Sequence, residues 1–137
     1  MTTTANSIRL ERTIDPSIER VYAAWTDPSL LTKWYCPNPA WEVKLEGDIA
    51  AGHDYRVHMG EHVVEGSYTE LTPPTTIAFT WRWANLDNPF SNVRVELTEA
   101  AEGTLLVLTH TDLADAEDAK NHEDGWVSCL NRLPEVV

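Results

Sequence analysis

The chain has 137 residues, of which 42% are hydrophobic and six are tryptophan, and this composition predicts one folded domain with a real core. Twenty-two acidic residues against ten basic ones give a formal net charge of −12 at pH 7. The few arginines are dispersed, so the charge argues against nucleic acid and anionic membranes as partners, because both require a basic surface.

The N-terminal segment and the cysteines bear on location. Residues 1–6 lack the basic start and apolar run of a signal peptide, and we expect them to be disordered. No apolar stretch approaches the roughly 18 residues that a membrane span requires, so no membrane insertion is expected. The two cysteines, Cys36 and Cys129, are too few for a disulfide framework, which favours the cytoplasm.

The first third of the chain predicts one strand and two helices. Residues 7–14 alternate between apolar and polar side chains, as a half-buried strand does. Asp15-Pro16 and Asp27-Pro28 each place an N-cap residue before a proline, so each is expected to start a helix. The predicted buried side chains are Ile18, Val21, Tyr22 and Trp25 in the first helix, and Leu30, Leu31 and Trp34 in the second.

From Trp41 onward the hydrophobic period changes to two, which indicates strands. Short turns and one polar loop over residues 84–92 separate these segments, so an antiparallel meander is expected. The predicted strands cover residues 41–45, 55–59, 63–71, 77–83, 93–97 and 104–111.

The last segment, residues 116–133, predicts an amphipathic helix that ends before Pro134. Its apolar stripe repeats at spacings of three and four residues and contains a histidine. The stripe consists of Ala119, His122, Trp126, Cys129, Leu130 and Leu133. The acidic residues at its start favour the positive N-terminal end of a helix. They are Asp112, Asp115, Glu117 and Asp118.

This order of elements predicts an α+β fold with a single domain over residues 1–137. A curved antiparallel sheet of about seven strands would wrap on the long C-terminal helix, and two short helices would close one end. Such a sheet leaves a concave, mostly apolar space, which is typical of a small-molecule pocket. The candidate ligand-binding residues are Trp34, Tyr55, Val57, Met59, Phe79, Trp81, Trp83, Val95, His110, His122, Trp126 and Leu130. Each aromatic ring among them could instead only pack the core.

Three residues are candidates for proton transfer. His110 has the same strand parity as Leu106 and Leu108, which predicts that it faces the helix, and His122 lies on the apolar stripe. A buried histidine can orient a polar ligand group or act as a general acid or base. Glu70 could serve as a base if burial raised its pKa. The alternatives are core histidines with satisfied hydrogen bonds and a structural role for Glu70.

Two further motifs are weaker. His58-Met-Gly-Glu-His62 spells a zinc-protease pattern, but that chemistry requires a helix, and the flanking alternation with Gly60 in the middle predicts a hairpin. No metal and no cofactor are therefore expected. Cys36 lies in a loop without a local base or positive charge, which argues against a nucleophile. The sequence contains no glycine-rich phosphate loop and no serine-nucleophile elbow.

Segments along nearly the whole chain resemble one superfamily in order. They are Arg12-Thr-Ile-Asp-Pro-Ser17, Val21-Tyr-Ala-Ala-Trp-Thr-Asp-Pro28, Leu31-Thr-Lys-Trp34, Gly52-His-Asp-Tyr-Arg56, Gly66-Ser-Tyr-Thr-Glu70, Pro73-Pro74, Phe79-Thr-Trp81, Gly103-Thr104, Thr109-His110 and His122-Glu-Asp-Gly-Trp126. The chain thereby resembles the SRPBCC (START-like, helix-grip) superfamily, in particular the group related to the C-terminal domain of the activator of the heat-shock-protein-90 ATPase. It departs from the family at His53, where a second glycine is common, and at Pro134, because the family's final helix often runs longer.

The resemblance implies a helix-grip fold and a cavity, because members bind lipids, polyketides, hormones and other hydrophobic molecules, and a minority are enzymes. We therefore expect binding of a hydrophobic or aromatic small molecule between the helix and the sheet. Three alternatives stay open: a chaperone cofactor that binds a protein partner, a cyclase-like or hydrolase-like enzyme that uses His122, His110 or Glu70, and a homodimeric scaffold without a ligand. An exposed apolar patch would favour a protein partner, whereas an internal cavity favours a ligand.

Overall fold

The computed structural model describes residues 7–15, 17–35, 40–84, 89–113 and 115–136. The strands are β1 (Ile8–Ile14), β2 (Val43–Gly47), β3 (Asp54–Met59), β4 (His62–Thr72), β5 (Thr76–Trp83), β6 (Ser91–Ala100) and β7 (Gly103–Thr111). The helices are α1 (Ile18–Thr26), α2 (Pro28–Leu31) and α3 (Ala116–Arg132), and a short 3-10 helix follows at Leu133–Glu135. The expected disorder of residues 1–6 and the expected loop position of Cys36 lie outside the described residues.

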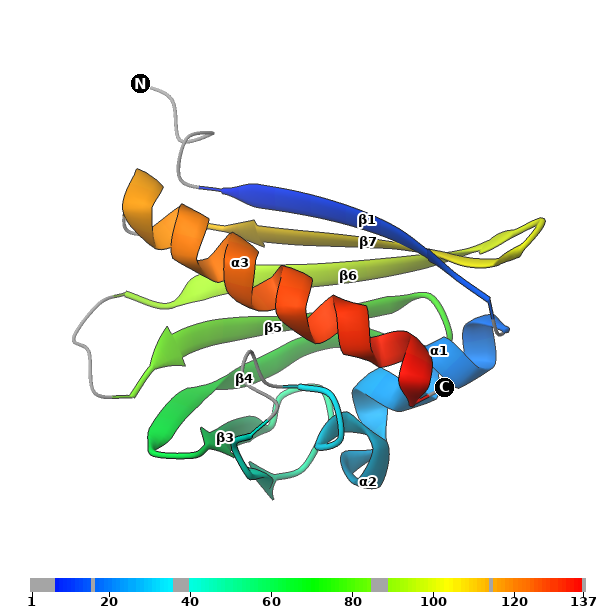
Figure 1. The fold of residues 1–137 in the computed structure, drawn as a ribbon. Helices are drawn as coiled ribbons and strands as arrows, with labels where there is room; N and C mark the ends of the chain where they lie inside the picture. The colour runs from blue at the N-terminus through cyan, green and yellow to red at the C-terminus, as the bar shows by residue number, and fades with distance from the viewer. Residues whose placement is uncertain (1–6, 16, 36–39, 85–88, 114, 137) are drawn as a thin grey trace.

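One antiparallel sheet holds the seven described strands in the order β1-β7-β6-β5-β4-β3-β2. The long helix α3 crosses one face of this sheet, and α1 and α2 lie together at one end (Figure 1). The predicted α+β helix-grip architecture is therefore confirmed. The first strand pairs with the last, so that Ile8 lies opposite His110 and Ile14 lies opposite Thr104.

The inner face of the sheet, toward α3, carries the apolar side chains that strand parity predicted. Along β3, β6 and β7 every second side chain is buried, because successive residues point to opposite faces. The buried inner-face residues include Tyr55, Val57 and Met59 on β3, Ile77, Phe79 and Trp81 on β5, Val93, Val95 and Leu97 on β6, and Leu106, Leu108 and His110 on β7. A register shift between Tyr68 and Glu70 on β4 interrupts the pairing with β5.

The two short helices begin differently from each other. At α2 the prediction is confirmed, since the Asp27 carboxylate accepts a hydrogen bond from the Ser29 backbone N–H at 3.0 Å, with Pro28 in the first turn. At α1 the predicted cap Asp15 is wrong, and Ser17 is the N-cap, without a side-chain bond. The physical reason is that Asp15 directly follows the last residue of β1, where the Ile14 and Asp15 carbonyls lie against Gly103, so the helix begins only after this contact.

The last helix matches its predicted span closely and buries its predicted stripe. Ala119, Trp126, Cys129 and Leu130 are buried along α3, and His122 exposes 9% of its side chain. The Asp115 carboxylate caps the helix by accepting from the Asp118 N–H at 2.8 Å. The acidic start of α3 therefore includes a cap, as its position suggested.

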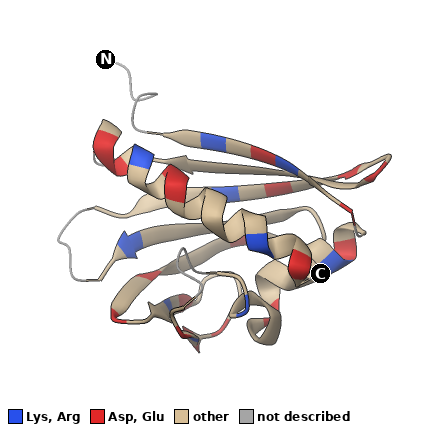
Figure 2. Cartoon of the chain, viewed as in Figure 1, with Lys and Arg blue, Asp and Glu red and all other residues tan. Residues whose placement is uncertain are grey.

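Basic side chains are scattered over the described strands and helices, whereas acidic side chains gather at the start of α3 (Figure 2). This distribution agrees with the absence of a basic patch in the sequence. None of the helices in the described parts of the chain is both long and apolar enough to span a bilayer.

Candidate functional site

A cavity of about 600 Å³ lies between α3 and the inner face of the sheet, and we call it the α3 cavity. The described residues that line it are Tyr35, Met59, Trp81, Trp83, Asp118, Asn121, His122, Asp124, Gly125, Trp126, Ser128 and Cys129. The buried members of this lining are aromatic or contain sulfur, whereas Asn121 and Asp124 are exposed. The cavity therefore has an apolar interior and a polar rim that belongs to α3.

Aromatic rings from three parts of the chain form the apolar wall. Trp81 and Trp83 alternate on β5 and so share one face, and their ring centroids are 5.9 Å apart at 77°. Trp126 on α3 lies 5.2 Å from Trp81, and Tyr35, which follows α2, lies 5.7 Å from Trp126. These tilted and edge-to-face arrangements are the ones that aromatic pairs prefer. The rings therefore hold one another in place through these contacts.

His122 lines the cavity and joins the helix to this wall. The Trp81 indole N–H donates to His122 Nε2 at 3.2 Å, so this nitrogen carries a lone pair. The other ring nitrogen, Nδ1, lies 2.9 Å from the backbone oxygen of Asp118 and therefore carries the proton. Both ring nitrogens of His122 are thus occupied by hydrogen bonds within the protein.

His110 lies behind the wall and is fully buried. Its Nδ1 accepts from the Trp126 indole N–H at 3.1 Å, and its Nε2 lies 2.7 Å from Ser91 Oγ. Because the Ser91 hydroxyl donates to the Trp81 carbonyl at 2.9 Å, the proton of the second bond belongs to His110 Nε2. Desolvation first, and the neighbouring His122 second, lower the pKa of His110 to about 3.

These bonds decide what the two histidines can do chemically. A general base needs a lone pair directed at the substrate. In both imidazoles that lone pair already accepts from an indole N–H, at Trp81 and at Trp126. In this arrangement the histidines position the aromatic wall, and proton abstraction by either ring would require breaking its indole bond.

The structure brings together five of the residues predicted to bind a ligand. Met59, Trp81, Trp83, His122 and Trp126 line the α3 cavity. The other predicted residues lie in the core, outside the cavity lining, and are Trp34, Tyr55, Val57, Phe79, Val95, His110 and Leu130.

Internal bonds explain two of these core positions. The Trp34 indole N–H donates to the Ala24 carbonyl at 3.0 Å, which joins the end of α2 to α1. The Tyr55 hydroxyl donates to the Thr80 carbonyl at 2.5 Å. To reach that carbonyl, the Tyr55 side chain passes over Gly66, the residue that pairs with Tyr55 on β4. A Cβ at Gly66 would collide with that same carbonyl, so the glycine makes the close approach possible.

The lining residues that the sequence did not predict as ligand contacts are Tyr35, Asp118, Asn121, Asp124, Gly125, Ser128 and Cys129. Most of them lie on α3 beside the predicted stripe. Asp118, Asn121, Gly125 and Ser128 are three or four residues apart, which places them on one helical face. The spacing of these residues is the feature of the sequence from which this part of the lining could have been predicted. The row marks the side of α3 where the cavity opens.

Glu70 does not join the site. Its carboxylate accepts from Arg94 at 3.1 Å and from the Thr72 hydroxyl at 3.1 Å, away from the cavity lining. These bonds lower its pKa, the larger effect coming from Arg94. A base with a raised pKa at this position is therefore contradicted, because the side chain is exposed and lies beside an arginine.

The predicted hairpin at His58 and His62 is confirmed, because β3 ends at Met59 and β4 begins at His62. The two histidines have different partners: His58 bonds Glu46, and His62 stacks near Trp41 with centroids 4.9 Å apart. No group of three or more metal-ligating side chains gathers within the described residues.

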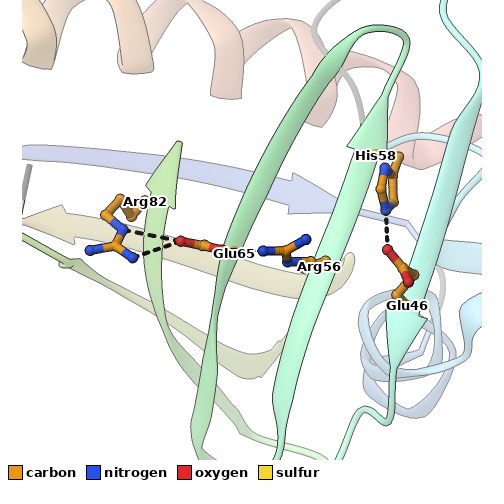
Figure 3. Close-up of polar contacts among 5 residues, drawn as sticks. All are labelled: Glu46, Arg56, His58, Glu65 and Arg82. Atoms are coloured by element: carbon orange, nitrogen blue, oxygen red, sulfur yellow. Dashed lines mark hydrogen bonds and ion pairs between the residues drawn. The ribbon is translucent and has the colours of Figure 1, made fainter. Parts of the chain in front are cut away.

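The outer face of the sheet, opposite the α3 cavity, carries a row of polar and charged pairs (Figure 3). Glu65 on β4 accepts from Arg82 at 2.7 Å and from Arg56 at 3.2 Å, and the Arg82 bond is the main reason that its pKa is lowered. The side-chain bond to His58 likewise lowers the pKa of Glu46. This row gives the solvent-exposed face of the sheet balanced charge across β2 to β5.

Comparisons with known proteins place the fold and the family. The family model described as Activator of Hsp90 ATPase homolog 1-like protein matches residues 15–137. The crystal structure of protein CV1439 from Chromobacterium violaceum is 31% identical, with 96% of each chain covered and a TM-score of 0.88. The AHSA1 protein from Silicibacter pomeroyi is 28% identical, with 94% of this chain and 95% of that chain covered and a TM-score of 0.80.

A more distant structure extends the likeness of the fold. DynU16, a protein of the dynemicin biosynthetic locus, is 20% identical and has a TM-score of 0.83. The alignment covers 95% of this chain and 46% of DynU16. A search of the curated proteins finds no match to this sequence.

Proposed function

Because this chain belongs to the family of Activator of Hsp90 ATPase homolog 1-like proteins, we propose that it binds a hydrophobic small molecule in the α3 cavity. The observation that carries this proposal is the wall of aromatic rings around a space of about 600 Å³. Ligand pockets have volumes of roughly 300–1,000 Å³ and are mainly apolar with a few polar groups. The α3 cavity has this size and this composition.

The polar bonds behind the wall support the same proposal. The indole N–H groups of Trp81 and Trp126 are already bonded to histidines, so these two rings offer a ligand their π faces and carbon edges. A ligand that covers them gains the hydrophobic effect, which is about 25 cal/mol for each Å² of apolar surface removed from water. The polar groups of the rim would then orient the ligand.

Catalysis and protein binding receive less support from the described residues. The acceptor nitrogens of both histidines are occupied, and Glu70 pairs with Arg94 outside the cavity lining. Among the described residues, the one large hydrophobic side chain that is exposed is Phe90, at 42%. The Arg82 guanidinium lies 4.1 Å from the centre of that ring, so Phe90 does not extend into an apolar patch.

The test is a variant that fills the cavity, compared with a matched variant on the same helix. Ser128 lines the cavity and Asn131 is exposed one turn later. Ser128→Phe is expected to weaken binding of the neutral fluorescent probe N-phenyl-1-naphthylamine by at least about tenfold. Asn131→Phe is expected to leave the affinity within about twofold, because its ring adds the same apolar surface outside the cavity.

Urea denaturation of both variants checks that each is folded at the temperature of the titration. Equal affinity of the wild type and Ser128→Phe, with both folded, would contradict binding in the α3 cavity. Native mass spectrometry of the purified protein adds an independent measurement, since a small molecule retained through purification would be displaced by the same substitution.

A further inference from the structure

The α3 cavity combines aromatic walls with carboxylates, and none of its described lining residues is a lysine or an arginine. Tyr35, Trp81, Trp83 and Trp126 supply the rings, and Asp118 and Asp124 supply the carboxylates. Aromatic rings attract cations through the negative potential of their faces, and the attraction strengthens where water is excluded. This combination constrains the charge of the ligand, beyond its hydrophobicity.

The carboxylates differ in their surroundings. Asp124 accepts from Lys120 at 2.8 Å on the exposed side of α3, so part of its charge is already balanced. The Asp118 carboxylate lies 3.3 Å from His122 Nδ1, and its side chain is 30% exposed. His122 Nε2 accepts from Trp81 on the sheet. The Asp118 carboxylate therefore lies next to a ring that is itself bonded to the aromatic wall.

The lining of the α3 cavity favours cationic ligands over anionic ones. An anionic head group would lose water beside Asp118, and none of the described lining residues is a lysine or arginine that could compensate for this loss. A cation would gain from both the carboxylates and the ring faces. The whole chain acts in the same direction, since its formal net charge of −12 favours the approach of cations.

On the basis of the function proposed above, we propose that the α3 cavity binds an organic cation, namely an amine with an aromatic or alkyl body. The body lies against Trp81, Trp83 and Trp126, and the ammonium group lies at the Asp118 end of the cavity. His122 acts as a positioning residue, because its two hydrogen bonds hold Trp81 against the helix.

Three probes with one ring system and three charges test the assignment by isothermal titration calorimetry at low salt and neutral pH. They are 1-naphthylmethylamine, 1-naphthalenemethanol and 1-naphthoate, which are cationic, neutral and anionic. The amine is expected to bind at least about tenfold more tightly than the carboxylate, with the alcohol between them. Added salt should weaken the binding of the amine and leave the affinity for the alcohol nearly unchanged.

A pair of isosteric variants locates the charge. Asp118→Asn is expected to lower the affinity for the amine about fivefold and to leave the affinity for the alcohol within about twofold of the wild-type value. The backbone oxygen of residue 118 still accepts from His122 in this variant, so the aromatic wall is kept. Glu117→Gln is the control, because Glu117 lies in the same helical turn, outside the described lining, and its loss changes the net charge equally.

The outcomes separate the two proposals. If the alcohol or the carboxylate binds as tightly as the amine, the cation assignment is wrong while ligand binding in the cavity stands. If Asp118→Asn and Glu117→Gln weaken the amine equally, the preference comes from net charge and the assignment to Asp118 is wrong. If none of the probes binds the folded wild type, both proposals are overturned.

Discussion

The buried imidazole of His110 predicts a loss of stability in mild acid. The pKa of His110 is lowered from 6.5 to about 3 in the folded protein, chiefly by desolvation and then by His122. As the pH falls below 6.5, the unfolded chain therefore binds a proton that the folded protein does not. Stability is present above pH 6.5 and is lost progressively until the pH reaches the folded pKa of about 3.

The size of the loss follows from the same two pKa values. Between pH 7 and pH 5, the free energy of proton binding to the unfolded imidazole amounts to about 2 kcal/mol, while the folded state gains almost nothing. The hydrogen bonds give the structural reason. A proton on Nδ1 would face the Trp126 N–H, which is a donor as well, so the bond of 3.1 Å would be lost.

The assay is urea denaturation of the wild type and His110→Gln at pH 7 and pH 5. A glutamine amide offers one donor group and one acceptor, as the neutral imidazole does, but it does not titrate. The variant should lose about 2 kcal/mol less than the wild type between the two pH values, since the other histidines and the acids are common to both.

Nuclear magnetic resonance of the His110 ring gives a second, direct measurement. The ring should stay neutral with its proton on Nε2 throughout the range in which the protein is folded. A titration midpoint near 6.5, or equal pH dependence of the two proteins, would show that the imidazole reaches a proton acceptor or water and would refute the reasoning.

Three further predictions test other contacts. Trp126→Phe removes the donor to His110 Nδ1 and should lower the free energy of unfolding in urea by about 1–3 kcal/mol; an unchanged midpoint would contradict a bond at this position. Gly66→Ala puts a methyl group against the Thr80 carbonyl and should cost about 1–3 kcal/mol or more by thermal denaturation, whereas an unaffected Tm would argue against the close approach. Glu70→Gln should leave the affinity for N-phenyl-1-naphthylamine within about twofold, and a larger loss would place Glu70 in the site.

Much of this fold could be predicted because two periodicities are clear in the sequence. The alternation on the strands correctly placed His110 and Trp81 on the inner face, and the spacing on α3 correctly placed Trp126. The N-cap at Asp15 was wrong, because a cap signal does not reveal where the preceding strand stops pairing. The span of β1 is set by its pairing with β7, which is distant in the sequence.

The site was harder to predict, because its geometry depends on how side chains from different elements fill space. Strand parity correctly put Tyr55 inside, but only the hydrogen bond to Thr80 shows that the ring belongs to the core. The partners of His110 and His122 come from other elements, so no local pattern reveals them. The cavity opens beside the apolar stripe of α3, and a stripe by itself predicts only which side faces inward.

The pairing of the first strand with the last constrains how the protein is made. Residues 8–14 leave the ribosome well before their partners at residues 104–110, because five other strands are synthesised between them. Contacts between such distant segments slow folding, because a long loop must close before they form. During synthesis the β6 edge and the apolar face of β1 stay exposed until β7 is added between them. The sheet therefore stays open to wrong pairing and aggregation until β7 has been synthesised.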